Sequence, residues 1–333
     1  GRLNFNNRIT TYQVYKSKRH FRPALFDQAR LIKFLLSSER TESIYHYFFT
    51  PNRKTSAMAR YIGRKHHDVK TVHTITSFHF TSKPPASYFF ADELVAVSET
   101  SRNRIQHIVN RPVNVITPGI PIPLLPTADQ KTALKQKYFL QDKCVVLYPG
   151  DWAFSQAEND VVELSKMLLP SFPDIVIVFA CRMKTDNDTF VEERVRQSLG
   201  GFGNRVRFLR EVSVMSDLIN ASDIVIFPVR SLYAKMDFPL VLLESMAASI
   251  PVVASDLPHL SELQNDQPQF NISLDDKAQW VTILKRLIDD HTFRMESGAA
   301  CRAKVQQKFR LDDMAARYDA LYARLLNSRN PNQ

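Results

Sequence analysis

Glycine is scarce in this sequence, with only eight residues among 333. Neither the dinucleotide fingerprint GxGxxG nor the phosphate loop GxxxxGK[ST] occurs. The scarcity therefore weighs against an NAD-binding fingerprint and against a P-loop nucleotidase. The serine elbow GxSxG and the zinc motif HExxH are also absent, so hydrolase and zinc-protease functions lack support.

Cysteines are few, and long apolar runs are absent. Cys144, Cys181 and Cys301 lie far apart with no CxxC pair, which argues against a disulfide framework and a structural zinc site. We expect no bound metal and a reducing, cytoplasmic setting. No run of about 18 apolar residues predicts a transmembrane helix, and the first twenty residues lack the apolar stretch of a signal peptide.

Positive charge is concentrated in the first part of the chain. Residues 1–125 hold 19 of the 44 Lys and Arg but only 7 of the 34 Asp and Glu. Such asymmetry predicts an anionic partner: nucleic acid, an acidic membrane surface or a phosphorylated substrate. The alternative is a solvated basic face that binds nothing. Zinc-finger spacing, an RNP-like strand and an arginine-rich tail are missing, so no nucleic acid is expected.

The second part of the chain alternates strictly between buried strands and helices. Short apolar runs alternate with amphipathic segments, which is typical of a parallel sheet covered on both faces. The predicted strands are 144–150, 174–182, 205–209, 223–229 and 251–256, and the predicted helices are 157–169, 188–199, 213–222 and 239–249.

The first part alternates less regularly and ends in a proline-rich segment. Helices are predicted at 24–36, 53–65 and 98–109, strands at 43–49, 69–75, 93–98 and 113–119, and C-terminal helices at 275–290, 291–309 and 311–326. Residues 117–126 are the best linker candidate. We therefore expect an N-terminal domain (1–120), a C-terminal domain (121–310) and a final helix (311–333) that packs back on the first domain.

Two α/β lobes place the natural ligand site in the cleft between them, beyond the carboxyl ends of the strands. Gly150 and Asp151 follow one strand where a phosphate-binding turn would lie; the alternative is a simple βα turn. Arg182 and Lys184 follow the next strand and suit phosphate contacts, unless they are merely solvated. His73, inside a strand, is more often a satisfied core residue than a catalyst.

The segment KMDFPLVLLESMA, residues 235–247, is the most informative. Its apolar run predicts a buried helix with Pro239 in the first turn, where proline is tolerated. The free N–H groups of that turn can face an anion. Glu244 should be buried or face the same pocket, where a carboxylate suits the hydroxyls of a ribose. The alternative is a buried glutamate paired with a nearby Arg or Lys.

These residues carry a family resemblance. DIVIFPV and FPLVLLESMAASIPVVASDLPHLSEL resemble the donor-binding core of retaining GT-B glycosyltransferases, specifically family 4 (group 1). ADELVAVSETSRNRI, VNVITPGIPI and VHTI fit the N-terminal half. The resemblance implies two facing Rossmann-like domains with parallel sheets. It also implies transfer of a sugar from a UDP- or GDP-sugar with retention, without a metal or other required cofactor.

The resemblance assigns roles to individual residues. The second glutamate of the family motif falls on Glu244, near the ribose, and the first falls on Met236, with Asp237 as the obvious substitute near the sugar. His73 would lie near the reacting sugar. The backbone of Phe238, Pro239, Leu240 and Val241 would meet sugar and diphosphate, and Arg182, Lys184 or Lys235 would neutralise the diphosphate.

The sequence also departs from the family pattern. Asp151 stands where the family commonly has an arginine, and no cation follows through residue 156. The family's first strand and Gly-rich loop are not recognisable, so we expect the start of the first domain to be missing or reduced.

We conclude from the sequence that the protein is a cytoplasmic retaining glycosyltransferase. Its expected partners are a nucleotide sugar and an acceptor of unknown identity: a glycan, a lipid-linked molecule or a phosphorylated small molecule. The basic first part suggests peripheral contact with the inner membrane face. The alternatives are a nucleotide-sugar epimerase on the same fold and a non-catalytic relative that binds a partner.

Overall fold

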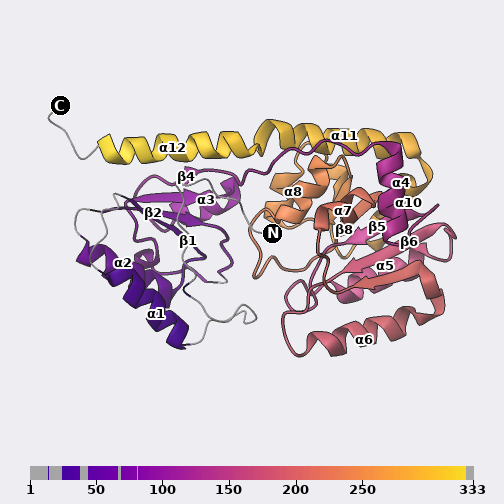
Figure 1. The fold of residues 1–333 in the computed structure, drawn as a ribbon, viewed down its shortest axis with the longest axis horizontal. Coiled ribbons are helices and arrows are strands. Elements are labelled where there is room, and N and C mark those ends of the chain that lie inside the picture. Colours follow the sequence, from indigo (N-terminus) through magenta and orange to yellow (C-terminus); the bar gives the residue numbers. More distant parts are fainter. Residues whose placement is uncertain (1–13, 15–24, 38–43, 67–68, 81, 328–333) are drawn as a thin grey trace.

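The computed structural model describes residue 14 and residues 25–37, 44–66, 69–80 and 82–327. They form two α/β lobes side by side, each built on a parallel sheet (Figure 1). The sheet of the first lobe has the order β1-β2-β3-β4, and that of the second has the order β10-β9-β8-β5-β6-β7. The predicted fold class, parallel sheets with helices on them, is thereby confirmed.

The first lobe surrounds a sheet of four short strands. Strands β1 to β3 pair in parallel along consecutive apolar segments, and β4 adds a single short edge. The elements are α1 (Leu25–Leu36), β1 (Ile44–Phe48), α2 (Arg53–Lys65), β2 (Lys70–Ile75), η1 (Ala86–Tyr88), β3 (Glu93–Ala96), α3 (Glu99–Gln106) and β4 (Asn114–Val115).

The second lobe begins with a linker helix and contains the larger sheet. Its strands are β5 (Cys144–Tyr148), β6 (Ile175–Ala180), β7 (Val206–Leu209), β8 (Ile224–Phe227), β9 (Val252–Ser255) and β10 (Asn271–Ile272). The helices of this lobe are α4 (Ala128–Lys137), α5 (Glu158–Leu168), α6 (Asp188–Leu199), η2 (Gly200–Arg205), α7 (Met215–Asn220), α8 (Leu240–Ala247), α9 (Pro258–Leu263), η3 (Pro268–Phe270), α10 (Lys277–Asp289) and α11 (His291–Lys308). The last helix, α12 (Leu311–Asn327), follows α11 and lies on the first lobe.

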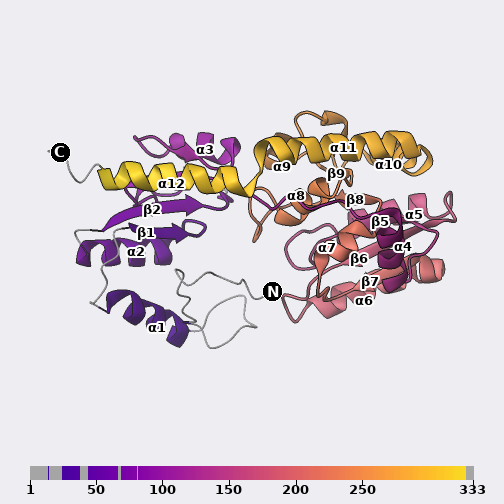
Figure 2. The same cartoon turned by 45° about the horizontal axis from the view of Figure 1, so that its top comes forward.

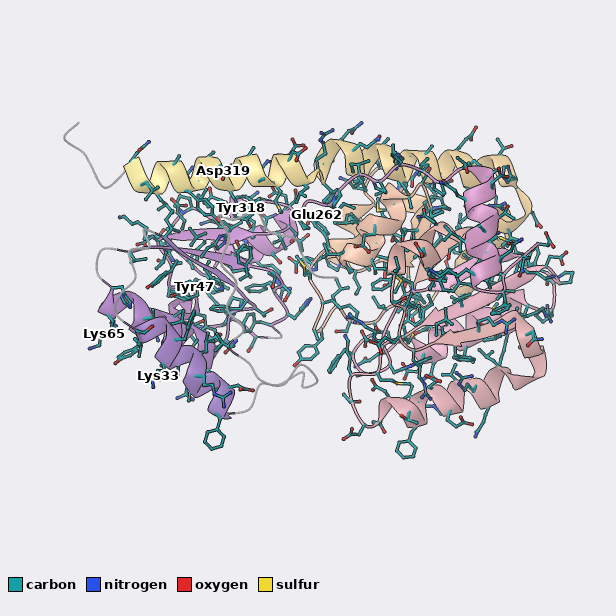
Figure 3. All side chains as sticks on the ribbon, viewed as in Figure 1. Lys33, Tyr47, Lys65, Glu262, Tyr318 and Asp319 are labelled. Carbon is teal, nitrogen blue, oxygen red and sulfur yellow. The ribbon has the colours of Figure 1, made fainter. Side chains whose placement is uncertain are left out.

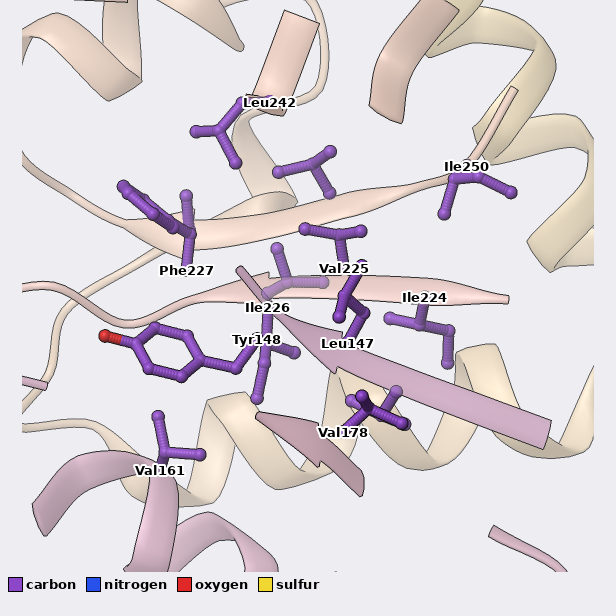
Figure 4. Packing of buried hydrophobic residues seen from close by; sticks show 14 of the residues in the cluster. Leu147, Tyr148, Val161, Val178, Ile224, Val225, Ile226, Phe227, Leu242 and Ile250 are labelled. Atoms are coloured by element: carbon purple, nitrogen blue, oxygen red, sulfur yellow. The ribbon is translucent and has the colours of Figure 1, made fainter. Parts of the chain in front are cut away.

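The core of the second lobe forms between the sheet and its covering helices. Every residue of β8 is buried, as are those of β6. Figure 4 shows Ile226 and Phe227 packing between Leu242 of α8 on one face and Tyr148 and Val161 toward the other. Burial of strands on both faces explains why their sequence is continuously apolar rather than alternating.

Helices α11 and α12 run end to end along both lobes (Figures 1 and 2). α12 lies on the first lobe, where Tyr318, Leu321 and Leu325 pack against Val72 and Val95 of its sheet. The chain therefore passes between the lobes twice, and both passages are bonded together.

Main-chain hydrogen bonds join the two segments, around Ile120 and around Arg310, at which the chain passes between the lobes. We call these two segments the double passage. The N–H of Ile120 donates to the carbonyl of Phe309 at 2.9 Å, and the N–H of Leu311 donates to the carbonyl of Ile120 at 3.2 Å. A side chain at position 119 would not fit, because a Cβ on Gly119 would come within 2.6 Å of the Arg310 carbonyl oxygen.

The structure adds two α-helices and the short strand β10 to the predicted elements, and it shortens one predicted strand. Helix α4 was not predicted, because none of its residues is buried and its sequence carries no apolar stripe. Helix α9 was also missed, being short and beginning at Pro258. The strand predicted at 113–119 pairs only at Asn114 and Val115, since prolines and glycine interrupt it afterwards. Residues 24 and 43 of the predicted elements lie outside the described residues.

Within the described part of the chain, no helix is both long enough and apolar enough to span a membrane.

Substituting Gly298 in α11 should destabilise the second lobe. A Cβ at this position would come within 2.0 Å of the carbonyl oxygen of Ser249, and overpacking against backbone costs about 1–3 kcal/mol. Urea unfolding of Gly298→Ala should show that loss. Gly63→Ala is the matched control: it also lies inside a helix, but its Cβ meets no atom within 4 Å, and alanine should stabilise it slightly. Equal shifts for both variants would contradict the packing argument.

Candidate functional site

The strand order of the second sheet locates a binding site. The order reverses between β5 and β8, which are paired at Val146–Ile224 and Leu147–Val225. In open parallel sheets, the loops that leave such a switch point diverge and form a crevice. Here the loop after β5 and the loop between β8 and α8 border a pocket of about 280 Å³.

The pocket is lined largely by residues predicted from the sequence. It is bordered by Pro149, Gly150, Asp151, Arg182, Lys184, Phe227, Ala234, Lys235, Met236, Pro239, Leu240 and Val241. Of the ten residues expected to bind the donor, eight are in this set. Phe238 is buried instead and packs edge-on against Phe309, with ring centroids 5.5 Å apart. Glu244 also lies outside the lining set.

A buried carboxylate organises the cations of the pocket. Asp151 is 3% exposed, and its Oδ2 accepts from Lys235 Nζ at 2.6 Å and Lys184 Nζ at 3.2 Å. Its Oδ1 accepts from the N–H groups of Phe154 and Ser155 at 2.7 and 3.2 Å. Burial opposes ionisation, but the two lysines and the N–H donors outweigh it and lower the pKa of Asp151 to about 2.

The positive charges exceed the negative one. Burial lowers the pKa of Lys235, while Asp151 beside it counteracts this effect. Arg182 borders the same pocket and is exposed; no hydrogen bond or ion pair joins its guanidinium to another described residue. Three cations around one carboxylate therefore leave two positive charges for a ligand.

Gly150 is required by a neighbour in the core. A Cβ there would come within 2.1 Å of Tyr148 Cζ, so the ring of a fully buried tyrosine occupies the space of a side chain. The sequence analysis predicts that Gly150 belongs to a phosphate-binding turn. The structure supplies an independent packing reason for the residue, and Gly150 still borders the pocket.

The start of α8 supplies further polar groups. Pro239 stands at the N-cap position, and its carbonyl accepts from the N–H of Leu242 at 2.9 Å. The N–H groups of Leu240 and Val241 belong to the first turn, where no intrahelical acceptor exists. Both residues border the pocket. Pro239 itself has no N–H, so only its carbonyl and ring can meet a ligand.

Glu244 is exposed and does not border the pocket, whereas the sequence predicts that it is buried or faces the pocket. It lies one turn along α8 from Leu240, on the side of the helix that remains accessible. No hydrogen bond or ion pair joins its carboxylate to another described residue, which removes the alternative of a buried Glu paired with a cation. Partial desolvation raises its pKa.

Asp237 lies in the interface between the lobes. It is 0% exposed, and its carboxylate accepts from Ser98 Oγ at 2.6 Å and Ser101 Oγ at 2.5 Å. The sequence placed it at the sugar as a substitute for a glutamate. In this arrangement its oxygens are already bonded, and it does not border the pocket.

His73 lies within the sheet of the first lobe. It is 0% exposed, its Nε2 is 3.1 Å from the Phe49 carbonyl, and its ring stacks on Phe90. Burial lowers the pKa of His73 to about 4, although the hydrogen bond to Phe49 works in the opposite direction. His73 is therefore a core residue of which only one ring nitrogen is hydrogen-bonded, because its buried Nδ1 has no partner among the described residues.

Sequence reasoning missed the histidines that do lie between the lobes. His79 follows β2, and its ring centroid is 6.1 Å from that of His259 on α9. His259 Nε2 is 3.2 Å from Ser101 Oγ and 3.5 Å from Asp237 Oδ1. The one sequence signal for this placement is that His79 lies just beyond the carboxyl end of a predicted strand.

Among the described residues, no group of three or more His, Cys, Asp or Glu is arranged to hold a metal ion.

The ion cluster of the pocket should contribute to stability in a pH-dependent way. Because the pKa of Asp151 is lowered from 3.8 to about 2, its contribution is present above pH 4 and is lost as the pH falls toward 2. Asp151→Asn should lower the free energy of unfolding by about 2 kcal/mol at pH 7, and the difference from wild type should shrink below pH 4. Urea unfolding at several pH values measures it. Asp186→Asn, at an exposed loop carboxylate, is the control; a pH-independent Asp151 effect would contradict the assignment.

Comparisons with known proteins agree with this geometry. The family model of glycosyl transferases group 1 matches residues 162–290. The lipopolysaccharide core biosynthesis mannosyltransferase LpsB of Rhizobium meliloti is 28% identical over 163 residues, which are 48% of this chain and 45% of the relative. The chain's match thus spans less than half the length of that curated relative.

Solved structures share the fold over nearly the whole chain. Anabaena HepE in complex with UDP and glucose has a TM-score of 0.74 at 16% identity, covering 90% of this chain and 83% of that one. A glycosyltransferase from Rickettsia africae also has a TM-score of 0.74, at 18% identity, covering 93% and 83%. Together with the two parallel sheets, they confirm the predicted GT-B fold. The family match over residues 162–290, the curated relative and the solved structures together support a group 1 glycosyltransferase.

Proposed function

We propose that the protein transfers a sugar from a nucleotide diphosphate sugar to an acceptor, with retention of configuration and without a required metal. The observation that carries this proposal is the pocket at the switch point between β5 and β8. It combines three cations, one carboxylate and the start of α8.

The charges of the pocket match a diphosphate. The diphosphate of a nucleotide sugar carries two negative charges, and Arg182, Lys184 and Lys235 exceed Asp151 by two positive charges. Each lysine ammonium has three donors, so it can keep its bond to Asp151 and also bind a phosphate oxygen. The free N–H groups of Leu240 and Val241 add donors of the kind that bind phosphate at helix starts.

The same groups suit the chemistry of transfer. As the bond to the sugar breaks, negative charge grows on the leaving diphosphate, and fixed cations and helix N–H groups stabilise it. The one carboxylate that borders the pocket, Asp151, is engaged by two lysines. No paired carboxylates at glycosidase spacing border it. We therefore assign proton uptake from the acceptor to the leaving phosphate oxygen, which fits retention.

Glu244 is our candidate for the nucleoside ribose. It lies about one helical turn, some 5 Å, beyond Leu240 at the pocket border. Its carboxylate is accessible and can accept hydrogen bonds from two hydroxyl groups. The relatives support a nucleotide donor without fixing it: HepE was solved with UDP and with UDP-glucose, and LpsB is a mannosyltransferase.

The acceptor is proposed to be anionic or associated with a membrane surface. Helix α2 carries Arg53, Lys54, Arg60, Arg64 and Lys65 and no acidic residue. Figure 3 shows Lys65 at the end of α2 and Lys33 on α1, on the side of the first lobe opposite α12. A basic face of this kind attracts anionic head groups, which is consistent with our placing the protein at the cytoplasmic face of a membrane.

Removing Arg182 should weaken nucleotide binding. A charge-assisted hydrogen bond contributes about 1.5–3 kcal/mol, so Arg182→Ala should raise the Kd for UDP or GDP about tenfold or more. Isothermal titration calorimetry measures it. Arg317→Ala, an exposed arginine on α12, should leave the Kd unchanged. If wild type binds neither nucleotide, the proposal fails.

Glu244 can be tested separately from the phosphate contacts. Glu244→Gln should weaken UDP or GDP binding about tenfold, because it loses charge-assisted bonds to the ribose, while affinity for inorganic diphosphate stays the same. Arg182→Ala should weaken both ligands. Equal loss of both ligands in Glu244→Gln would remove it from the ribose site.

Incubation of donor with and without acceptor separates the function from its alternatives. A transferase consumes donor rapidly only when an acceptor is present, and hydrolyses it slowly alone. An epimerase converts the sugar of the donor by itself. A non-catalytic relative leaves the donor intact under both conditions.

A further inference from the structure

One buried carboxylate ties the pocket loop to the first lobe. Asp237 is 0% exposed, and its carboxylate accepts from Ser98 Oγ, Ser101 Oγ and the N–H of Phe78 at 2.6, 2.5 and 3.3 Å. Its own N–H donates to the carbonyl of Thr76 at 3.1 Å. All four partners lie just beyond the carboxyl ends of β2 and β3 or at the start of α3.

A second carboxylate reaches the same helix from α9. Glu262 accepts from the N–H groups of Glu99 and Thr100, both at 2.8 Å, and from Thr100 Oγ1 at 2.6 Å. These N–H groups belong to the first turn of α3, which Ser98 caps. Helix starts attract anions, and here the anions are two side chains of the other lobe. Figure 3 shows Glu262 at the boundary between the lobes.

The two carboxylates, which we call the interlobe clamp, act beside the pocket. Asp237 is the residue between Met236 and Phe238, and Met236 and Pro239 border the pocket. On its other side, Phe238 packs against Phe309 at the double passage of the chain. The main chain of residues 235–240 is therefore fixed to the first lobe by Asp237 and to the passage by Phe238.

Because the carboxylate of Asp237 is buried, the attachment of the pocket loop to the first lobe depends strongly on the hydrogen-bond donors around that carboxylate. Its charge is stabilised by three donors, and loss of donors leaves an uncompensated charge inside the protein. The bonds should therefore form or break together when the lobes close or separate. Interfaces between lobes are otherwise expected to permit relative motion.

We propose that Asp237 and Glu262 are positioning residues for the transfer reaction, holding the pocket loop and the first lobe at the separation at which donor and acceptor meet. This inference rests on the proposed function. Asp237 then acts through the main chain of residues 235–240 rather than by contact with the sugar. The start of α3 is filled by the protein itself and is not available to an anionic acceptor.

The test uses variants on both sides of the interlobe clamp. Glu262→Gln and the double variant Ser98→Ala/Ser101→Ala leave every pocket residue intact, and Asp237→Asn removes the central charge. Glu296→Gln, on the exposed face of α11, is the matched control. Hydrogen exchange of peptides covering residues 76–80 and 98–102, together with small-angle X-ray scattering, reports the attachment without requiring activity.

We expect at least tenfold faster exchange at residues 98–102 in Glu262→Gln and in the double variant, with a larger radius of gyration than wild type. The kcat for transfer should fall at least tenfold, while the Kd for UDP or GDP changes less than threefold, because every side chain that borders the pocket is kept and the salt bridges of Lys184 and Lys235 to Asp151 do not involve the clamp. The control should match wild type in all three measurements.

Two results would overturn the inference. Unchanged exchange and scattering in both clamp variants would show that the contacts do not hold the lobes. Loss of kcat in Asp237→Asn with full kcat in the double variant and in Glu262→Gln would show that Asp237 contacts the substrate directly. If wild type binds no nucleotide, the proposed function fails, but exchange and scattering still decide whether the interlobe clamp holds the lobes.

Discussion

The arrangement of this protein depends on carboxylates from one lobe that bond to the start of a helix in the other. Asp237 and Glu262 satisfy donors at α3 that would otherwise face the space between the lobes. Because Asp237 stands within the loop that borders the pocket, the position of the first lobe and the position of this loop are linked. The double passage at Ile120 and Phe309 provides the second point of attachment.

In the pocket, too, a buried carboxylate is held by hydrogen-bond donors and positions the groups around it. Asp151 is buried, yet two lysines and two N–H groups keep its pKa near 2, so the cations remain in place with no ligand required to order them. Asp151 stands where the resembling family commonly has an arginine. The positive charge comes instead from Arg182, Lys184 and Lys235, which belong to the loop after β6 and the loop after β8. Prearranged charge of this kind can stabilise negative charge that develops on a bound ligand.

Much of the second lobe was predictable because its local signals are strong. Buried strands are continuous apolar runs, α5 is amphipathic, and α8 is an apolar run that follows a proline, so their positions were predicted to within a few residues. Helix α4 was missed because its surface is polar all round. Eight of the ten residues expected to bind the donor border one pocket, since strand ends in a parallel sheet converge at the same edge. Glu244 and Phe238 do not border this pocket, because the rotation of a helix and the packing of a loop decide which side chains face outward.

The sequence by itself determined the fold class, the alternation of strands and helices, and the loops that would meet at the pocket, because hydrophobic periodicity and strand-end position are local properties. Only the tertiary structure decided the surroundings of His73, which lies in an aromatic layer of the first sheet, and of Asp237, which bonds to Ser98 and Ser101. These partners lie 139 and 136 positions away from Asp237 in the chain. No local pattern encodes such a separation, since it arises from the packing of one lobe against the other.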